Sequence, residues 1–268
     1  MHTVSVASDK GRRSENQDYA DTVSGLLPKD NRVYTLAGLA DGHGKHGAAM
    51  SAAAVQAAFD AMNDLFSLCR VRPRHYTTAV EVAFQEANKA TLAVKGTTEG
   101  TSGTTLDLLL FTDTYFLLGH LGDARVYAAG SGLRQLTKDS VLYKDDSVPN
   151  PPPYELGLYY ANATTKPNAL GYTKRVYPDI IVGQAKRMLL VTDGIWRTVH
   201  IDELSEALGQ RSALECILRR ARNPAKVIEV LSRIHNQRAT GKTAEQLYES
   251  LAAHDNTTAV LVEYSDAD

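Results

Sequence analysis

The chain has 268 residues, 43% of them hydrophobic, so it can bury a core as one large domain or two small ones. Its 29 Lys and Arg against 31 Asp and Glu give a net charge of −2, which supplies no general attraction to nucleic acid or to an anionic membrane. The two cysteines are isolated, and no stretch approaches the roughly 18 uninterrupted apolar residues of a membrane span. We therefore expect a cytoplasmic protein.

The first third of the chain predicts strands followed by two helices. Alternating and β-branched residues predict three strands, and longer apolar periodicities then predict the helices. The first helix is rich in alanine but is interrupted by Ser, Gln and Asp, so we expect it to pack on a sheet. The strands are expected at 3–8, 19–23 and 32–40, and the helices at about 46–68 and 76–95.

Strands return in the middle of the chain, joined by short connections that imply antiparallel neighbours. They are expected at 102–111, 114–122, 124–130 and 133–137. Residues 145–168 are polar and rich in proline, which predicts a surface excursion. A strand, four helical patterns and a closing strand follow, at 186–194, 201–208, 211–221, 225–236, 243–253 and 257–264.

Aspartates mark the ends of several predicted strands. Asp41, Asp123 and Asp193 each end an apolar run, in LAGLAD, FLLGHLGD and RMLLVTD. Asp18 and Asp255 stand instead just before a strand begins. Because the end of one antiparallel strand and the start of its neighbour share one edge of a sheet, all five carboxylates can converge.

Five converging carboxylates point to a metal site. Unit charges about 4 Å apart repel by about 4 kcal/mol at an effective dielectric of about 20, and divalent cations relieve that repulsion. Oxygen ligands without cysteine fit Mg²⁺ or Mn²⁺ better than zinc. We expect Gly42 to let the backbone turn, so that its carbonyl joins the ligand set. An ordinary Asp-Gly turn explains one such aspartate alone, but not the whole set.

Seven short motifs follow one another along the chain: GRRSENQD (11–18), LADGHG (39–44), SGTTL (102–106), LGDARVY (121–127), LT before Asp139 and Ser140, LLVTDGIW (189–196) and HDNTTAVLV (254–262). In this order they resemble the motifs of the metal-dependent (PPM, type 2C) protein serine/threonine phosphatases, in the form of a bacterial single-domain member. The resemblance spans about residues 3–264 and departs from the usual pattern at Gln17 and at the KDS of 138–140.

The resemblance implies an α+β fold in which two packed antiparallel β-sheets, a β-sandwich, are flanked by antiparallel helix pairs. A binuclear metal centre would lie at one sheet edge. Residues 1–268 would form a single phosphatase catalytic domain with a flap-like excursion at about 140–180.

The resemblance also implies metal roles for the aspartates. Asp41 corresponds to the residue that bridges two Mn²⁺ or Mg²⁺ ions, and Gly42 to a carbonyl ligand of the second ion. Asp193 and Asp255 correspond to the remaining ligands of the first ion. In the same comparison, Asp18 would order waters of the second ion. Asp123 would bind a third, weaker ion together with Asp193.

The expected reaction is hydrolysis of phosphoserine or phosphothreonine by direct attack of a water or hydroxide that bridges the metals. Arg13 corresponds to the phosphate-binding arginine, and His43 is the expected general acid for the leaving alkoxide. In the proline-rich excursion, Tyr159 and Tyr160 could grip a phosphopeptide or could only pin the loop to the domain.

The expected partners are phosphorylated proteins, including a Ser/Thr protein kinase and its substrates, and the chain itself is expected to be a monomer. A catalytically weak relative that serves as a binding or regulatory module is the alternative. Intact Asp18, Asp41, Asp193 and Asp255 favour the enzyme. A metal-dependent nuclease would use similar carboxylates, but the acidic balance and the lack of a basic groove signature argue against it.

Overall fold

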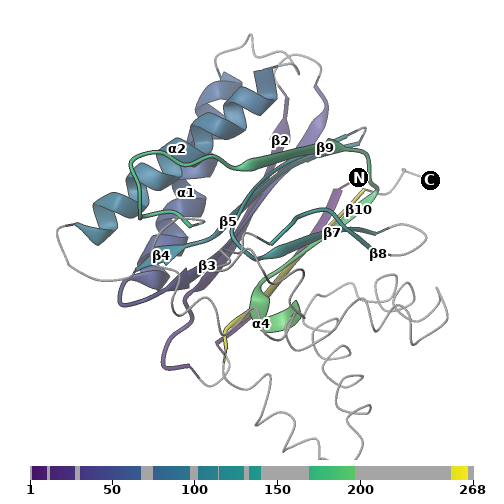
Figure 1. Ribbon diagram of the computed structural model, residues 1–268. Coiled ribbons are helices and arrows are strands. Elements are labelled where there is room, and N and C mark those ends of the chain that lie inside the picture. The colour runs from purple at the N-terminus through teal and green to yellow at the C-terminus, as the bar shows by residue number, and fades with distance from the viewer. Residues whose placement is uncertain are drawn as a thin grey trace, which may run out of the picture.

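Two antiparallel sheets packed face to face organise the computed structural model (Figure 1). It describes residues 2–10, 13–27, 31–67, 75–96, 102–113, 115–129, 133–139, 169–196 and 255–264. The first sheet has the strand order β1 (His2–Asp9), β11 (Thr257–Tyr264), β10 (Arg187–Val191), β7 (Arg125–Ala129) and β8 (Leu133–Gln135). The second has the order β2 (Asp18–Leu26), β3 (Val33–His43), β5 (Leu106–Thr112), β6 (Phe116–Leu121) and β9 (Asp179–Gly183), with β4 (Gly103–Thr104) paired to β3.

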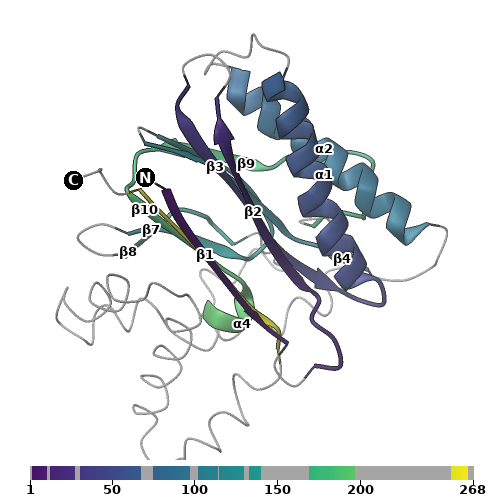
Figure 2. The same cartoon turned by 180° about the vertical axis from the view of Figure 1, so that it is seen from behind.

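Two helices cover the outer face of the second sheet. Figure 2 shows α1 (Gly47–Ser67) and α2 (Tyr76–Lys95) side by side, with β2 and β3 beneath them. They confirm the helices expected at 46–68 and 76–95 and the packing of the alanine-rich segment on a sheet. The helices expected between 201 and 253 lie outside the described residues.

The central strands of the second sheet, β3, β5 and β6, are buried on both faces, which explains why they read as continuous apolar runs. One face of β3 and β5 packs Leu36 and Leu110 against α1 and α2. The opposite face packs Leu39 and Leu109 against Leu190 and other residues of the first sheet. The alternation of side chains along each strand thus divides the core into a layer between helices and sheet and a layer between sheets.

The expectation that 114–122 and 124–130 are paired neighbours is wrong. β6 belongs to the second sheet and β7 to the first, so residues 122–124 cross between the sheets. Gly122 has a φ of +132°, which L side chains rarely adopt, and a Cβ there would lie 2.5 Å from Thr105. The crossing puts Asp123 at the junction of the two sheets.

Two further elements were not expected from the sequence. β9 and the one-turn helix α4 (Asp193–Trp196) are short, and β9 is an edge strand with Val182 exposed. Upstream of β9, Leu170 forms a bridge to Thr104. Residues 169–183 therefore lie against the body of the protein, whereas 140–168 fall outside the described residues.

A buried ionisable pair joins β5 and β6. Asp107 and His120 face each other in register, and His120 Nδ1 lies 2.6 Å from Asp107 Oδ1. The His120 Nε2–H donates to the Lys138 carbonyl at 3.1 Å. Burial raises the pKa of Asp107. Burial alone would lower the pKa of His120, but attraction to Asp107 and its hydrogen bonds outweigh this effect and raise it.

Replacing His120 by Leu should lower the free energy of unfolding by about 3–5 kcal/mol, because it leaves a buried carboxylate without its partner. The double variant with Asp107→Leu and His120→Leu should recover most of that loss, since it removes the uncompensated charge. Urea denaturation followed by circular dichroism measures both. Asp107→Leu is measured alone as well. If the free energy of unfolding of the double variant falls by the sum of the two single losses, the pair is not a coupled unit.

Candidate active site

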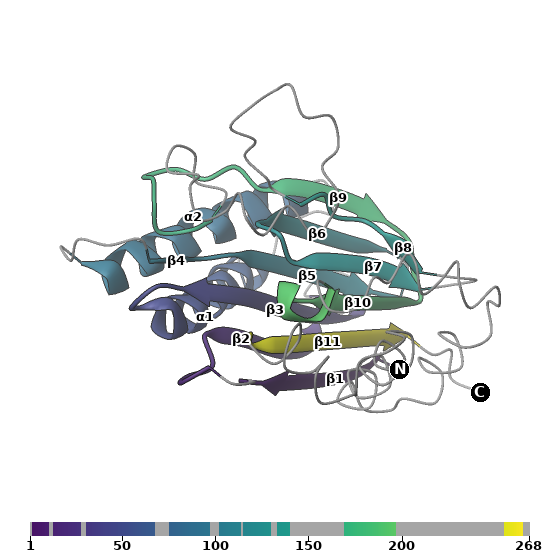
Figure 3. The same cartoon turned by 60° about the horizontal axis from the view of Figure 1, so that its bottom comes forward.

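Strand ends from both sheets place the predicted site aspartates. Asp18 begins β2 and lies opposite Asp41 of β3 in the antiparallel register. Asp193 begins α4 just after β10, and Asp255 lies just before β11, the neighbour of β10. Figure 3 shows α4 at the end of β10, near β11. Strand polarity thus brings two aspartates together in each sheet, as expected, but the two pairs come from different sheets and not from one sheet edge.

The carboxylates lie close enough to oppose one another's ionisation. Desolvation raises the pKa of Asp41 well above its usual value, and Asp193, Asp18, Asp123 and Asp255 raise it further. Burial raises the pKa of Asp18 to about 7, with further contributions from Asp193 and Asp255. Asp41 thus lies within reach of the electrostatic field of all the other four.

Threonines and a tightly packed backbone hold this end of the sheets. The Thr192 hydroxyl donates to Asp18 Oδ2 at 2.9 Å, and the Thr105 hydroxyl accepts from the Asp41 N–H at 2.9 Å. A Cβ at Gly42 would lie 2.3 Å from the Gly47 carbonyl oxygen. The expected backbone turn at Gly42 is wrong, because β3 runs on to His43. The glycine is needed there for close approach of two backbone segments.

A divalent cation fits the chemistry of this donor set. Asp18 is 6% exposed, and its Oδ1 has no hydrogen-bond partner among the described residues, so the structure leaves a buried acceptor unsatisfied. Hard cations favour such carboxylate oxygens and offset their mutual repulsion. In the described part of the chain, no group of three or more His, Cys, Asp or Glu side chains is arranged so that it could hold a metal ion by itself.

Arg13 lies at the edge of the carboxylate cluster. Its Nη2 lies 3.0 Å from Asp255 Oδ1, and the two side chains are 55% and 39% exposed. The segment that carries Arg13 is fixed by Asn256, whose Nδ2 donates to the carbonyls of Lys10 and Glu15 and whose Oδ1 accepts from the Gln17 N–H. The guanidinium therefore remains open to solvent while its backbone is held.

His43 lies at the exposed end of β3, next to the aspartates. Its Nε2 lies 2.7 Å from the Tyr172 hydroxyl, and the two rings stack with centroids 5.8 Å apart. Partial desolvation of the imidazole, and then the nearby Lys95 ammonium, lower the pKa of His43. His43 is nonetheless an exposed residue, as donation to an incoming ligand requires.

The described structure thus brings together Arg13, Asp18, Asp41, Gly42, His43, Asp123, Asp193 and Asp255. Tyr159 and Tyr160 lie outside the described residues. Sequence reasoning missed Thr192, Asn256 and Tyr172. The first two stand inside quoted motifs, beside Asp193 and Asp255, and adjacency could have signalled them. Tyr172 belongs to no motif.

The cavity found between α2 and residues 175–178 is not this site. It has a volume of about 490 Å³ and is lined by residues of α2 and of that segment, without any of the cluster aspartates. Its lining residues are Glu81, Val82, Gln85, Arg175, Val176, Tyr177 and Pro178.

None of the helices in the described ranges is both long and apolar enough to cross a membrane.

Comparisons with known proteins agree with this architecture. The structure is similar to a serine/threonine phosphatase from S. agalactiae, with a TM-score of 0.65, 19% identity and coverage of 99% of this chain and 100% of that one. It is similar to the PPM Ser-Thr phosphatase MsPP from Mycobacterium smegmatis, with a TM-score of 0.60, 20% identity and 98% of each chain covered. The Mycobacterium tuberculosis serine/threonine phosphatase PstP/Ppp gives a TM-score of 0.59, 23% identity and 99% coverage of both chains.

A search of curated proteins finds no match. The family model described as Protein phosphatase 2C matches residues 8–252, which is most of the chain and includes seven of the eight site residues named above. The chain therefore belongs to the protein phosphatase 2C family.

Proposed function

We propose that the chain hydrolyses phosphoserine and phosphothreonine in proteins at the end of the two sheets, with Mn²⁺ or Mg²⁺ as cofactor. The observation that carries this proposal is the strand pairing that puts Asp18 opposite Asp41 and brings Asp193 and Asp255 to neighbouring strand ends, in a chain of the protein phosphatase 2C family. Such a group of carboxylates is stable only when cations or protons neutralise it. The alternative, a catalytically weak binding module, finds no support among the site residues.

In this proposal Asp41, the Gly42 carbonyl, Asp193 and Asp255 would hold the metal ions, and Asp18 would help to orient water beside them. Asp123 would take part in a weaker third site together with Asp193. The unsatisfied Oδ1 of Asp18 supports its share in this task. When bound, the ions would lower the pKa of a coordinated water and neutralise charge that develops on the phosphoryl oxygens.

The other two residues act on the substrate. Arg13 presents a guanidinium fork, whose two parallel N–H donors suit two phosphate oxygens. Its ion pair with Asp255 shows that its reach extends to the cluster. His43 donates a proton to the serine or threonine oxygen as it leaves phosphorus, because an alkoxide is a poor leaving group without one.

The substrates we infer are phosphorylated proteins, among them the products of a Ser/Thr protein kinase in the same cell compartment, which we infer to be the cytoplasm. The family supports the substrate class, and the exposure of Arg13 and His43 supports access by a protein chain.

Asp41→Asn and Asp193→Asn should each reduce Mn²⁺-dependent turnover of a phosphothreonine peptide by at least about 100-fold, because loss of one ligand removes several kcal/mol of activation. They should also lose the rise in melting temperature that Mn²⁺ gives the wild type. Without metal, both should melt at or above the wild-type temperature, since each removes one repelling charge.

The exposed Asp113→Asn serves as the control, and it should retain both activity and the Mn²⁺-dependent rise. A cluster variant that keeps full activity in chelator-treated buffer with Mn²⁺ restored would rule out the metal assignment.

Arg13→Ala should raise KM for a phosphopeptide about tenfold with little change in kcat, because a charge-assisted contact to phosphate holds the ground and transition states alike. Arg13→Lys should recover only part of that loss, since an ammonium has no planar fork. Steady-state kinetics with the exposed Arg134→Ala as control tests this. An unchanged KM would remove Arg13 from phosphate binding.

His43→Ala should lower kcat for a phosphoserine peptide by about 100-fold and should affect p-nitrophenyl phosphate far less, because nitrophenolate leaves without protonation. The matched control is His46→Ala, which removes a neighbouring imidazole with no proposed role. Equal losses on the two substrates would mean that His43 is not the proton donor.

A further inference from the structure

A tyrosine far away in sequence contacts the candidate proton donor. Tyr172 Oη lies 2.7 Å from Nε2 of His43, 129 residues away, and the planes of the two rings are inclined by 20°. The contact thus restricts the imidazole in two ways. The hydrogen bond fixes one ring nitrogen, and the stacked phenol ring limits rotation about the Cβ–Cγ bond.

Helix α2 holds the segment that carries Tyr172. Asn88 is fully buried; its Oδ1 accepts from the Gly171 N–H at 2.9 Å, and its Nδ2 donates to the Thr173 carbonyl at 2.7 Å. One amide therefore fixes the backbone on both sides of Tyr172. The Lys95 ammonium donates to the Gly171 carbonyl and lies 4.6 Å from the centroid of the Tyr172 ring.

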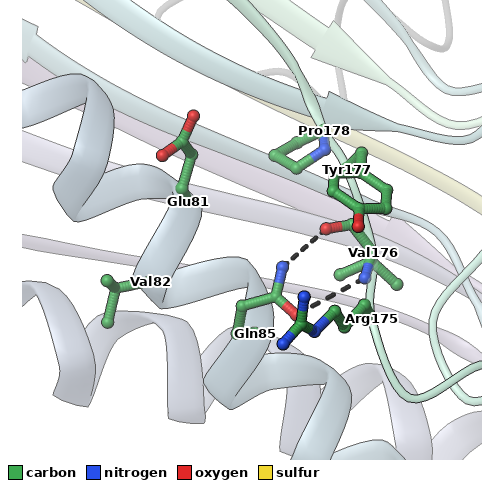
Figure 4. Close-up of a pocket in the computed structure, with 7 residues that line it drawn as sticks. All are labelled: Glu81, Val82, Gln85, Arg175, Val176, Tyr177 and Pro178. Carbon is green, nitrogen blue, oxygen red and sulfur yellow. Dashed lines mark hydrogen bonds between the residues drawn. The ribbon is translucent and has the colours of Figure 1, made fainter.

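The same helix continues this attachment further along the segment. Figure 4 shows the Gln85 side chain directed at Val176, where its Nε2 donates to the carbonyl at 2.5 Å and its Oε1 accepts from the N–H at 3.4 Å. Three side chains of one helix thus bind the backbone between residues 171 and 176. This arrangement gives Tyr172 a rigid support even though its own side chain is 40% exposed.

Gly103 supplies the space in which the two rings meet. It pairs with His43 across β3 and β4. A Cβ at position 103 would lie 2.4 Å from Cε2 of Tyr172 and 3.0 Å from Cε1 of His43. Any other residue there would displace one ring or both. The pairing of β4, the seating of Tyr172 and the orientation of His43 are therefore one packing arrangement.

We propose that Tyr172 is a positioning residue of the phosphatase, whose hydroxyl and ring hold the His43 imidazole in the orientation from which it protonates the leaving serine or threonine oxygen. This inference rests on the proposed function. It adds a residue that acts through His43. The proposal gives Tyr172 no contact with the metal-binding carboxylates or with the phosphate.

Tyr172→Phe tests the inference, because it removes the hydroxyl and keeps the ring, its stacking and its contact with Lys95. We expect kcat for a phosphoserine peptide to fall about tenfold with KM unchanged, while kcat for p-nitrophenyl phosphate stays within about twofold. Tyr177→Phe is the matched control, since it removes the hydroxyl of a 79% exposed tyrosine on the same segment. Tyr177→Phe should leave kcat and KM unchanged for both substrates.

A double-variant cycle separates positioning from a general structural effect. In a His43→Ala background, Tyr172→Phe should cause no further loss, because the group that it positions is gone. Additive losses, or equal losses on the peptide and on p-nitrophenyl phosphate, would overturn the proposal. So would a full retention of peptide turnover by Tyr172→Phe.

Nuclear magnetic resonance of the metal-free protein provides a readout that does not depend on activity. The imidazole signals of His43 should shift in Tyr172→Phe and stay unchanged in Tyr177→Phe. If they do not shift, the contact itself is absent in solution and the proposal fails. If they shift but the wild type hydrolyses no phosphate ester with Mn²⁺ or Mg²⁺, the proposed function fails instead.

Discussion

Repulsion among carboxylates at one end of two packed sheets is the constraint on which the candidate site depends. Asp18 and Asp41 are opposed in one sheet, while Asp193 follows the end of β10 and Asp255 precedes the adjacent β11 in the other. The cost of bringing them together must be met by the rest of the fold, because like charges destabilise a compact state. The leucine-rich layers on both faces of the second sheet supply that stability. Hydrogen bonds of Thr105, Thr192 and Asn256 then hold the strand ends in place.

Much of this arrangement could be predicted from residues at strand ends. The aspartates are predictable because antiparallel pairing alone brings the end of β3 next to the start of β2, and the end of β10 next to the start of β11. The crossing at Asp123 was not predictable in this way, since a short connection usually joins neighbouring strands, whereas here the chain passes through Gly122 at a positive φ into the other sheet. The role of Gly42 was also misjudged, because the partner backbone at Gly47 is known only from the fold.

Tyr172 shows where sequence reasoning stops. No periodicity or spacing relates it to His43, and its place depends on an amide of α2, a lysine near the end of that helix and a glycine of β4. The sequence next to each of these residues does not indicate a contact with Tyr172 or with its neighbours in the chain. Contacts that depend on three distant segments at once become visible only when the packing of all three is known.

The described residues on the two sides of 140–168 are bound to different parts of the protein. On one side, the Arg125 guanidinium donates hydrogen bonds of 3.0 and 2.9 Å to the Asp139 carboxylate, and the His120 Nε2–H donates to the Lys138 carbonyl. On the other side, Asn88 fixes Gly171 and Thr173. The free-energy cost of joining two fixed ends rises by only about 0.6 kcal/mol for each doubling of the number of residues between them. A change in the number of residues between Asp139 and residue 169 is therefore expected to leave His43 and the aspartates in place.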